Sequence, residues 1–128
     1  MPEQEMKIIL AIGTGSFIGG IFRYLLAQFV QSKLPFAFPY GTLCVNIIGC
    51  FLIGIVFGIS ERVNLDTTLR LFLITGLIGG FTTFSAFSYE TLGLLRTGHL
   101  WVASAYVISS VLIGLLATFT GYMLFKLG

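Results

Sequence analysis

The stretch GGFTTFSAFSYET, residues 79–91, decides the fold because it interrupts an otherwise apolar segment of the chain. Two glycines and two threonines, all poor helix formers, come soon after the apolar run LFLITGLI at 71–78. In hydrocarbon, a broken helix is tolerated only where its freed backbone groups are buried in protein or line a cavity. The stretch therefore predicts a functional helix break, provided that the surrounding segment lies in a membrane.

The composition indicates that it does. Apolar residues make up 56% of the 128 residues and charged residues only 9%, whereas a soluble domain carries about 25% charged residues. So few charges cannot cover a water-soluble globule. We therefore expect lipid to surround most of the chain.

Four apolar segments are each long enough to cross a bilayer as a helix, which takes about 20 residues. No segment alternates with the period of a barrel strand. We expect an all-α membrane protein with a single four-helix domain over 1–128. The segments run over residues 8–30, 41–60, 71–95 and 100–125.

The connections at 31–40, 61–70 and 96–100 are short. The first should be irregular because it holds two prolines, and Asp66 in the second is a candidate helix cap. With four helices, both termini and the second connection share one side of the membrane. Flanking positive charge sets orientation, but here it is nearly balanced, which leaves a fixed orientation and insertion in both directions open. One side carries Lys7, Arg62, Arg70 and Lys126, and the other Lys33, Arg96 and, nearest to it, Arg23.

The residues give little support for an enzyme or a metal site with side-chain ligands. Cys44 and Cys50 are six residues apart on one expected helix, so they point to different faces, and neither has an acid or histidine beside it. His99 stands alone in a turn. We find no nucleophile–base pair, no phosphate-binding glycine loop and no basic face for nucleic acid, so we expect no enzymatic activity.

Polar side chains at membrane depth are the candidate functional residues. Thr42 and Asn46 are four apart and share a helix face, as do Tyr106 and Ser110. An amide in hydrocarbon is costly without a partner, so Asn46 either joins two helices through a hydrogen bond or contacts a permeating species. The Thr42 and Ser110 hydroxyls can instead bond back to their own helices, and Tyr106 can serve packing alone.

Arg23 lies about 22 Å along the first expected helix, if each residue rises about 1.5 Å. Its side chain can extend to the nearer interface or line an aqueous vestibule, where a cation attracts anions. The residues alone leave both alternatives open.

The break should separate half-helices at 69–78 and 85–95. Freed carbonyls there are ligands for a hard cation, and freed amide hydrogens favour anions. Phe84 and Phe87, three apart, would share a face just past the break. Because the edge of an aromatic ring is positive, the pair could hold a small anion, or the rings could simply pack in the core or face lipid.

GGFTTFSAFSYET resembles the signature of the small fluoride channels of the CrcB/Fluc family. GTLCVN at 41–46 is similar to the second-helix motif of that family, and GGIFR at 19–23 to its first-helix motif. The match in length, hydropathy and motif order covers nearly the whole chain. Ala86 departs from the pattern, since many relatives carry a hydroxyl residue there.

This resemblance implies an antiparallel, dual-topology homodimer in the cell membrane that passes fluoride passively and so lowers intracellular fluoride. It implies a structural sodium ion shared by both subunits and bound by the backbone carbonyls of Gly79 and Thr82. The residues that it places along the fluoride pathway are Phe84, Phe87, Asn46, Tyr106, Ser110, Thr42 and Arg23.

Two other classes of protein are alternatives to a channel. A small dual-topology multidrug exporter also has four helices, but its proton-coupled transport needs an acid in the middle of the first helix, where this chain has Arg23. Glu90, the acid inside the third apolar segment, lies beyond the expected break. A purely structural subunit would need no polar track at all.

Overall fold

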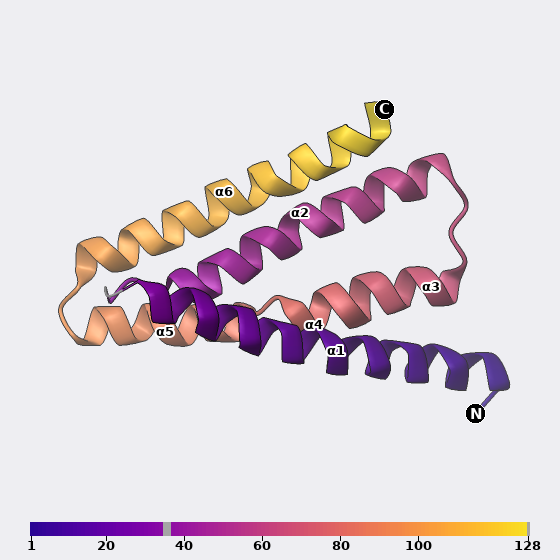
Figure 1. Cartoon of the computed structure of the whole chain (residues 1–128), viewed down its shortest axis with the longest axis horizontal. Helices are drawn as coiled ribbons and strands as arrows, with labels where there is room; N and C mark the ends of the chain where they lie inside the picture. The colour runs from indigo at the N-terminus through magenta and orange to yellow at the C-terminus, as the bar shows by residue number, and fades with distance from the viewer. Residues whose placement is uncertain (35–36, 128) are drawn as a thin grey trace.

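The computed structural model describes residues 1–34 and 37–127, and all regular secondary structure in these residues is helical (Figure 1). Four stretches are long and apolar enough to cross a membrane, which confirms the predicted class of multi-pass all-α protein. The elements are α1 (Glu3–Lys33), α2 (Tyr40–Arg62), α3 (Thr67–Leu71), the π-helix η1 (Phe72–Ile78), α4 (Gly79–Phe81), α5 (Phe84–Arg96) and α6 (Leu100–Leu127).

The helices extend beyond the predicted apolar segments. α1 begins at Glu3 and ends at Lys33, although the apolar segment covers only 8–30. Hydropathy marks the part of a helix that lipid surrounds, and polar residues continue the same helix into the interface. The irregular connection predicted for 31–40 is therefore too long at its start; its residues 35–36 lie outside the part of the chain that the structure describes.

Both termini lie at the same end of the molecule as the connection between α2 and α3 (Figure 1). Side chains tie α2 to α6 at this end. The Tyr122 hydroxyl donates to the Glu61 carboxylate, Lys126 lies 3.4 Å from the same carboxylate, and Arg62 donates to the Phe125 carbonyl at 3.2 Å. At the start of α3, the predicted Asp66 cap is confirmed, because its carboxylate accepts hydrogen bonds from the next helical amides.

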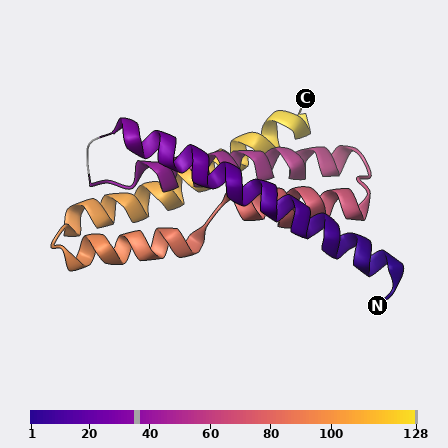
Figure 2. The same ribbon diagram turned by 60° about the horizontal axis from the view of Figure 1, so that its bottom comes forward.

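Glycines four residues apart let the neighbouring helices approach closely, as the pairs Gly15/Gly19 in α1 and Gly54/Gly58 in α2 show. A methyl group on Gly54 of α2 would clash with the Thr118 carbonyl of α6, and one on Gly58 would lie 2.7 Å from the Tyr122 carbonyl. α1 packs in the same way against η1 and α4, which it crosses in Figure 2. A small residue on one helix thus faces the backbone of the next.

The third membrane segment is broken, but three residues later than the glycines suggest. Thr82 and Thr83 have extended backbones, with φ/ψ of −97°/158° and −151°/118°. Gly79 and Gly80 remain helical, so the prediction of a half-helix that ends at residue 78 is wrong. β-branched threonine accommodates the extended conformation, and the Thr83 hydroxyl caps α5 by accepting from the Ala86 amide at 3.1 Å.

Gly80 does not break the helix; it allows the third segment to pack closely against α1. A methyl group there would lie 2.7 Å from the carbonyl oxygen of Ser16 in α1.

The residues before α4 form the π-helix η1, which nothing in the sequence pattern indicated. π-helices are rare and frequently occur at functional sites.

The packing of α1 against the third segment makes a testable difference between adjacent glycines. A methyl group on Gly19 would clash with the Leu77 carbonyl and lie 2.9 Å from the Phe81 amide, whereas one on Gly20 meets nothing within 4 Å. We expect Gly19→Ala to lower the free energy of unfolding by about 1–3 kcal/mol, the usual cost of overpacking. Gly20→Ala should change it by about 0.5 kcal/mol or less. Reversible unfolding in mixed micelles measures both; equal unfolding midpoints would contradict the packing.

Candidate functional site

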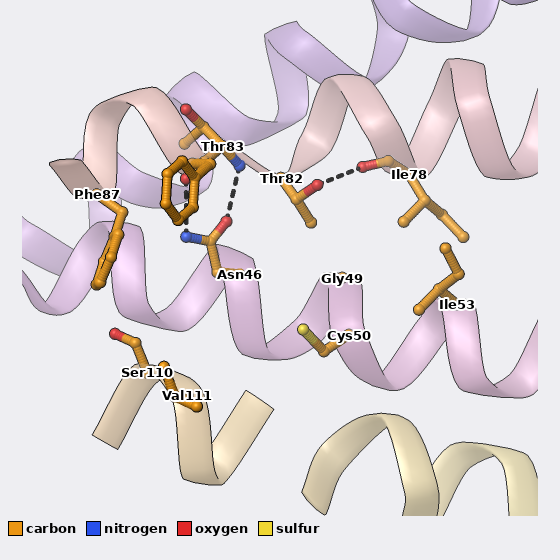
Figure 3. A pocket seen from close by; sticks show the side chains of 11 residues that line it. Asn46, Gly49, Cys50, Ile53, Ile78, Thr82, Thr83, Phe87, Ser110 and Val111 are labelled. Carbon is orange, nitrogen blue, oxygen red and sulfur yellow. Dashed lines mark hydrogen bonds between the residues drawn. The ribbon is translucent and has the colours of Figure 1, made fainter. Parts of the chain in front are cut away.

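The break opens beside a pocket of about 380 Å³, which we call the break pocket (Figure 3). Its walls come from α2, the residues around the break, α5 and α6. Five of the nine residues singled out in the sequence as site residues line this pocket, so the fold gathers residues that lie far apart in the chain. The lining residues are Asn46, Gly49, Cys50, Ile53, Ile78, Thr82, Thr83, Phe84, Phe87, Ser110 and Val111.

Asn46 of α2 forms two hydrogen bonds with the backbone of the break. Its Oδ1 accepts a hydrogen bond from the Thr83 amide at 2.8 Å, and its Nδ2 donates to the Thr83 carbonyl at 3.0 Å. In an uninterrupted helix the Thr83 amide would donate to the Gly79 carbonyl instead. Of the alternatives left open for Asn46, the structure therefore contains the interhelical hydrogen bond. The second Nδ2 proton has no partner among the described residues and remains available at the pocket.

The two phenylalanines after the break are neighbours, as predicted. The ring centroids of Phe84 and Phe87 lie 5.6 Å apart with an interplanar angle of 41°. Phe87 also packs against Tyr106, at 5.1 Å between centroids, which joins it to the core. Phe84 differs, because 77% of it is exposed on the single chain. One ring is thus fixed by packing and the other stands at the open side of the pocket.

Tyr106 and Ser110 supply hydroxyl groups without partners. Tyr106 is fully buried, yet neither its hydroxyl nor the Ser110 Oγ has a hydrogen-bond partner among the described residues. The expectation that Ser110 bonds back to its own helix is therefore not met. Its side chain lines the break pocket, and Figure 3 shows it pointing toward Phe87. Buried polar groups are nearly always hydrogen-bonded, so two unpaired hydroxyls on one helix face point to a missing ligand or water.

Arg23 and Thr42 lie elsewhere, at a second pocket of about 240 Å³ on the other side of the break. We call it the arginine pocket. Thr83 lines both pockets. The Arg23 side chain turns into the protein, where its Nε donates to the Gly80 carbonyl at 3.1 Å. It therefore lines a cavity and does not extend along α1 to an interface.

The sequence reasoning gave Glu90 no place in the site. The Thr42 hydroxyl donates to its carboxylate at 2.6 Å, and both residues line the arginine pocket. Its position inside the third apolar segment could have identified it as a site residue. A carboxylate within the membrane is costly and therefore indicates a functional site.

The carbonyls of Gly79 and Thr82 fit a hard cation chemically. Neither accepts a hydrogen bond from any described residue. The donors that a continuous helix would give them are diverted: the Thr83 amide donates to Asn46 and the Ala86 amide to the Thr83 hydroxyl. Gly79 is exposed on the single chain. Unpaired oxygens are what a hard cation requires, and two from one chain leave its coordination incomplete.

Comparison with known proteins agrees with the motifs. A family model described as CrcB-like protein, Camphor Resistance (CrcB), matches residues 10–122. A protein of Flavobacterium psychrophilum named fluoride-specific ion channel FluC is 44% identical over 122 residues, covering 94% of this chain and 98% of the relative. Proteins of the same name from Chlorobium phaeobacteroides and Aquifex aeolicus are 43% and 41% identical, covering 99% and 93% of this chain and 98% and 97% of the relatives. The chain belongs to the CrcB-like protein family.

Proposed function

We propose that this protein is a fluoride-selective ion channel of the cell membrane, through which fluoride leaves the cell passively. The observation that carries the proposal is the break pocket, where two phenyl rings, an asparagine amide and an unpaired serine hydroxyl meet without a fully charged group. The relatives named fluoride-specific ion channel support the choice of ion.

Each group in the pocket has a role in this mechanism. Ring edges of Phe84 and Phe87 carry partial positive charge, while the Asn46 amide and the Ser110 hydroxyl can donate hydrogen bonds. The unpaired hydroxyl of Tyr106, whose ring packs against Phe87, is a further donor. Such donors replace water around a small anion without binding it as tightly as a full charge would. Weak binding matters because an ion must also leave the site for current to flow.

The arginine pocket is the proposed vestibule. Arg23 uses Nε on the Gly80 carbonyl, which leaves the other guanidinium N–H groups for the cavity. A cation in a cavity with low-dielectric walls raises the local concentration of anions. Thr42 and Glu90 form the polar wall opposite, and Thr83 connects this pocket to the break pocket.

We further propose that the channel is an antiparallel homodimer. Phe84 is largely exposed on one chain, and the break pocket opens at this side, so a second chain is needed to complete the wall. The nearly balanced basic residues at the two ends permit insertion in both directions. A C₂ dimer brings the same surface of each chain together.

A structural sodium ion at this interface is part of the proposal. The unpaired carbonyls of Gly79 and Thr82, contributed by both chains, would give the cation four oxygens. It would hold the two breaks together and would not be transported. The ion would supply charge and order at the interface, while the pathway side chains would contact fluoride.

The exporter alternative has less support. Arg23 occupies the first helix where proton coupling would need an acid, and the Glu90 carboxylate is engaged by Thr42. An enzyme is not proposed, because the residues that line the break pocket include no base to activate the Cys50 thiol or the Ser110 hydroxyl.

The aromatic pair tests the function directly. Phe84→Ile and Phe87→Ile keep apolar bulk but remove the ring edges, so each should lower fluoride efflux about tenfold, the effect of about 1.4 kcal/mol on a barrier. A fluoride electrode measures efflux from liposomes that contain the purified protein. Phe119→Ile is the matched control, because Phe119 is exposed on α6 away from both pockets. Wild-type protein that passes no fluoride, or two pathway variants that match the control, would reject the proposal.

Asn46 has two roles that separate by substitution. Asn46→Leu removes both bonds to Thr83, so it should cost about 1–3 kcal/mol of stability as well as efflux. Asn46→Asp keeps the acceptor for the Thr83 amide but removes the donor and adds negative charge. We expect Asn46→Asp to lower the rate of fluoride efflux strongly while the midpoint of unfolding changes little. If Asn46 is purely structural, the midpoint should fall and the efflux rate should follow only the loss of folded protein. Unfolding midpoints and efflux rates on the same preparations distinguish the two.

Sodium removal tests the cation. After dialysis into a large organic cation on both sides of the membrane, we expect fluoride efflux to fall and added sodium to restore it. Thr82→Ser should be tolerated because the carbonyl remains. Gly79→Val should be severe, since its Cβ would lie 3.3 Å from the Ile74 carbonyl and branching adds bulk there. Full efflux without sodium, with Gly79→Val tolerated, would remove the cation from the account.

A further inference from the structure

We infer that Arg23 is a positioning residue for the helix break, in addition to any effect of its charge on anions. The inference starts from the Gly80 carbonyl. In a continuous helix this oxygen would accept from the amide of Phe84. That amide lies beyond the break and makes no such bond in the described residues, and Arg23 Nε donates to the Gly80 oxygen instead, at 3.1 Å.

The rest of α1 holds Arg23 at this position. Gly15, Gly19 and Arg23 are spaced by four residues and therefore lie along one face of α1. Both glycines are buried against the third segment, so closely that neither has room for a methyl group. The backbone of α1 thus cannot slide without opening this contact, and the Arg23 side chain begins at a fixed height beside the break.

Neighbouring contacts fit the same arrangement. The Ser16 hydroxyl donates to the Gly76 carbonyl at 3.4 Å, and Gly80 itself packs against the Ser16 backbone. On the opposite side Asn46 of α2 pairs with both backbone groups of Thr83. α1 therefore fixes the last turn before the break, and α2 fixes the extended residues after it.

The two parts of the guanidinium can be separated chemically. An effect on anions needs a positive charge in the arginine pocket, wherever its protons point. A positioning role needs an N–H group at the place of Nε, whether or not it is charged. Glutamine carries its Nε2 the same number of bonds from Cα as arginine carries Nε, whereas the lysine nitrogen lies one bond further out.

The positional role has a consequence for the cation. Gly80 follows Gly79 and lies in the same turn as Thr82, so its hydrogen bond also restricts the two carbonyls that we propose as sodium ligands. This consequence rests on the proposed function. A break that moves more should need more sodium for half-maximal activation of fluoride efflux.

The experiment compares Arg23→Gln, Arg23→Lys and Arg23→Met with the wild type, in purified protein at saturating sodium. Amide hydrogen exchange over residues 79–84, read by mass spectrometry, reports the order of the break without any transport. Arg96→Met is the matched control, since Arg96 is an exposed arginine at the end of α5. Half-activating sodium for fluoride efflux is measured on the same variants.

We expect Arg23→Met to exchange about tenfold faster than the wild type, as loss of a charge-assisted hydrogen bond implies. Arg23→Gln should exchange more slowly than Arg23→Met and than Arg23→Lys, with the smallest rise in half-activating sodium of the three. Arg96→Met should match the wild type. If Arg23→Met does not yield folded protein, the comparison of exchange rates between Arg23→Gln and Arg23→Lys decides whether Arg23 positions the break.

Exchange in Arg23→Met equal to the wild type, or Arg23→Lys better ordered than Arg23→Gln, would overturn the inference and leave Arg23 as a charge alone. Wild-type protein without fluoride efflux would instead reject the proposed function. The exchange comparison still decides the positioning role in that case, because it uses no fluoride.

Discussion

A helix that stops and restarts within a membrane leaves backbone amides and carbonyls that lipid cannot hydrogen-bond. In this protein the interruption lies at Thr82 and Thr83, and the rest of the structure is arranged around it. Asn46 pairs with both backbone groups of Thr83, Arg23 with the Gly80 carbonyl, and the Thr83 hydroxyl with the start of α5. An unpaired buried polar group costs several kcal/mol in hydrocarbon, so these contacts are conditions for the break to exist.

The pairing is incomplete, and the unpaired groups identify the site. No described residue donates to the carbonyls of Gly79 and Thr82, and both Gly79 and Phe84 are exposed on the single chain. The hydroxyls of Tyr106 and Ser110 on α6 also have no partner among the described residues, and Ser110 lines the break pocket. Oxygens that could bind a cation and hydroxyl protons that could bind an anion therefore lie around the same break. Such an arrangement would let one structure hold both the proposed fixed sodium ion and a moving fluoride ion.

The sequence predicted the large features because these depend on composition and spacing. Length and hydropathy gave four spans, and the motif around 79–91 gave a break with two adjacent rings. The position of the break could not be read in the same way. Glycine has low helix propensity, which suggested 79–80, but in a packed membrane helix these residues permit contact with α1 and remain helical. Tertiary packing overrode propensity, as it commonly does.

Side-chain pairing was also beyond the sequence. Spacing placed Thr42 and Asn46 on one helix face, yet one residue bonds Glu90 and the other Thr83, and they line different pockets. The π-helix η1 in the third segment could not be predicted either, because no residue pattern in the sequence distinguishes it from an α-helix. The roles of the pathway residues came from the family motif. A series of hydrogen-bond donors along a helix does not by itself distinguish fluoride from another small anion.

The most direct test of the account is the reversal potential of the current through the purified protein in a planar bilayer, with a fluoride gradient and equal chloride and pH on both sides. A passive fluoride pore predicts current that reverses near the equilibrium potential of fluoride and stays there when a chloride gradient is added. Reversal that follows chloride or protons, or no current at all, would contradict a fluoride-selective channel built around the broken helix.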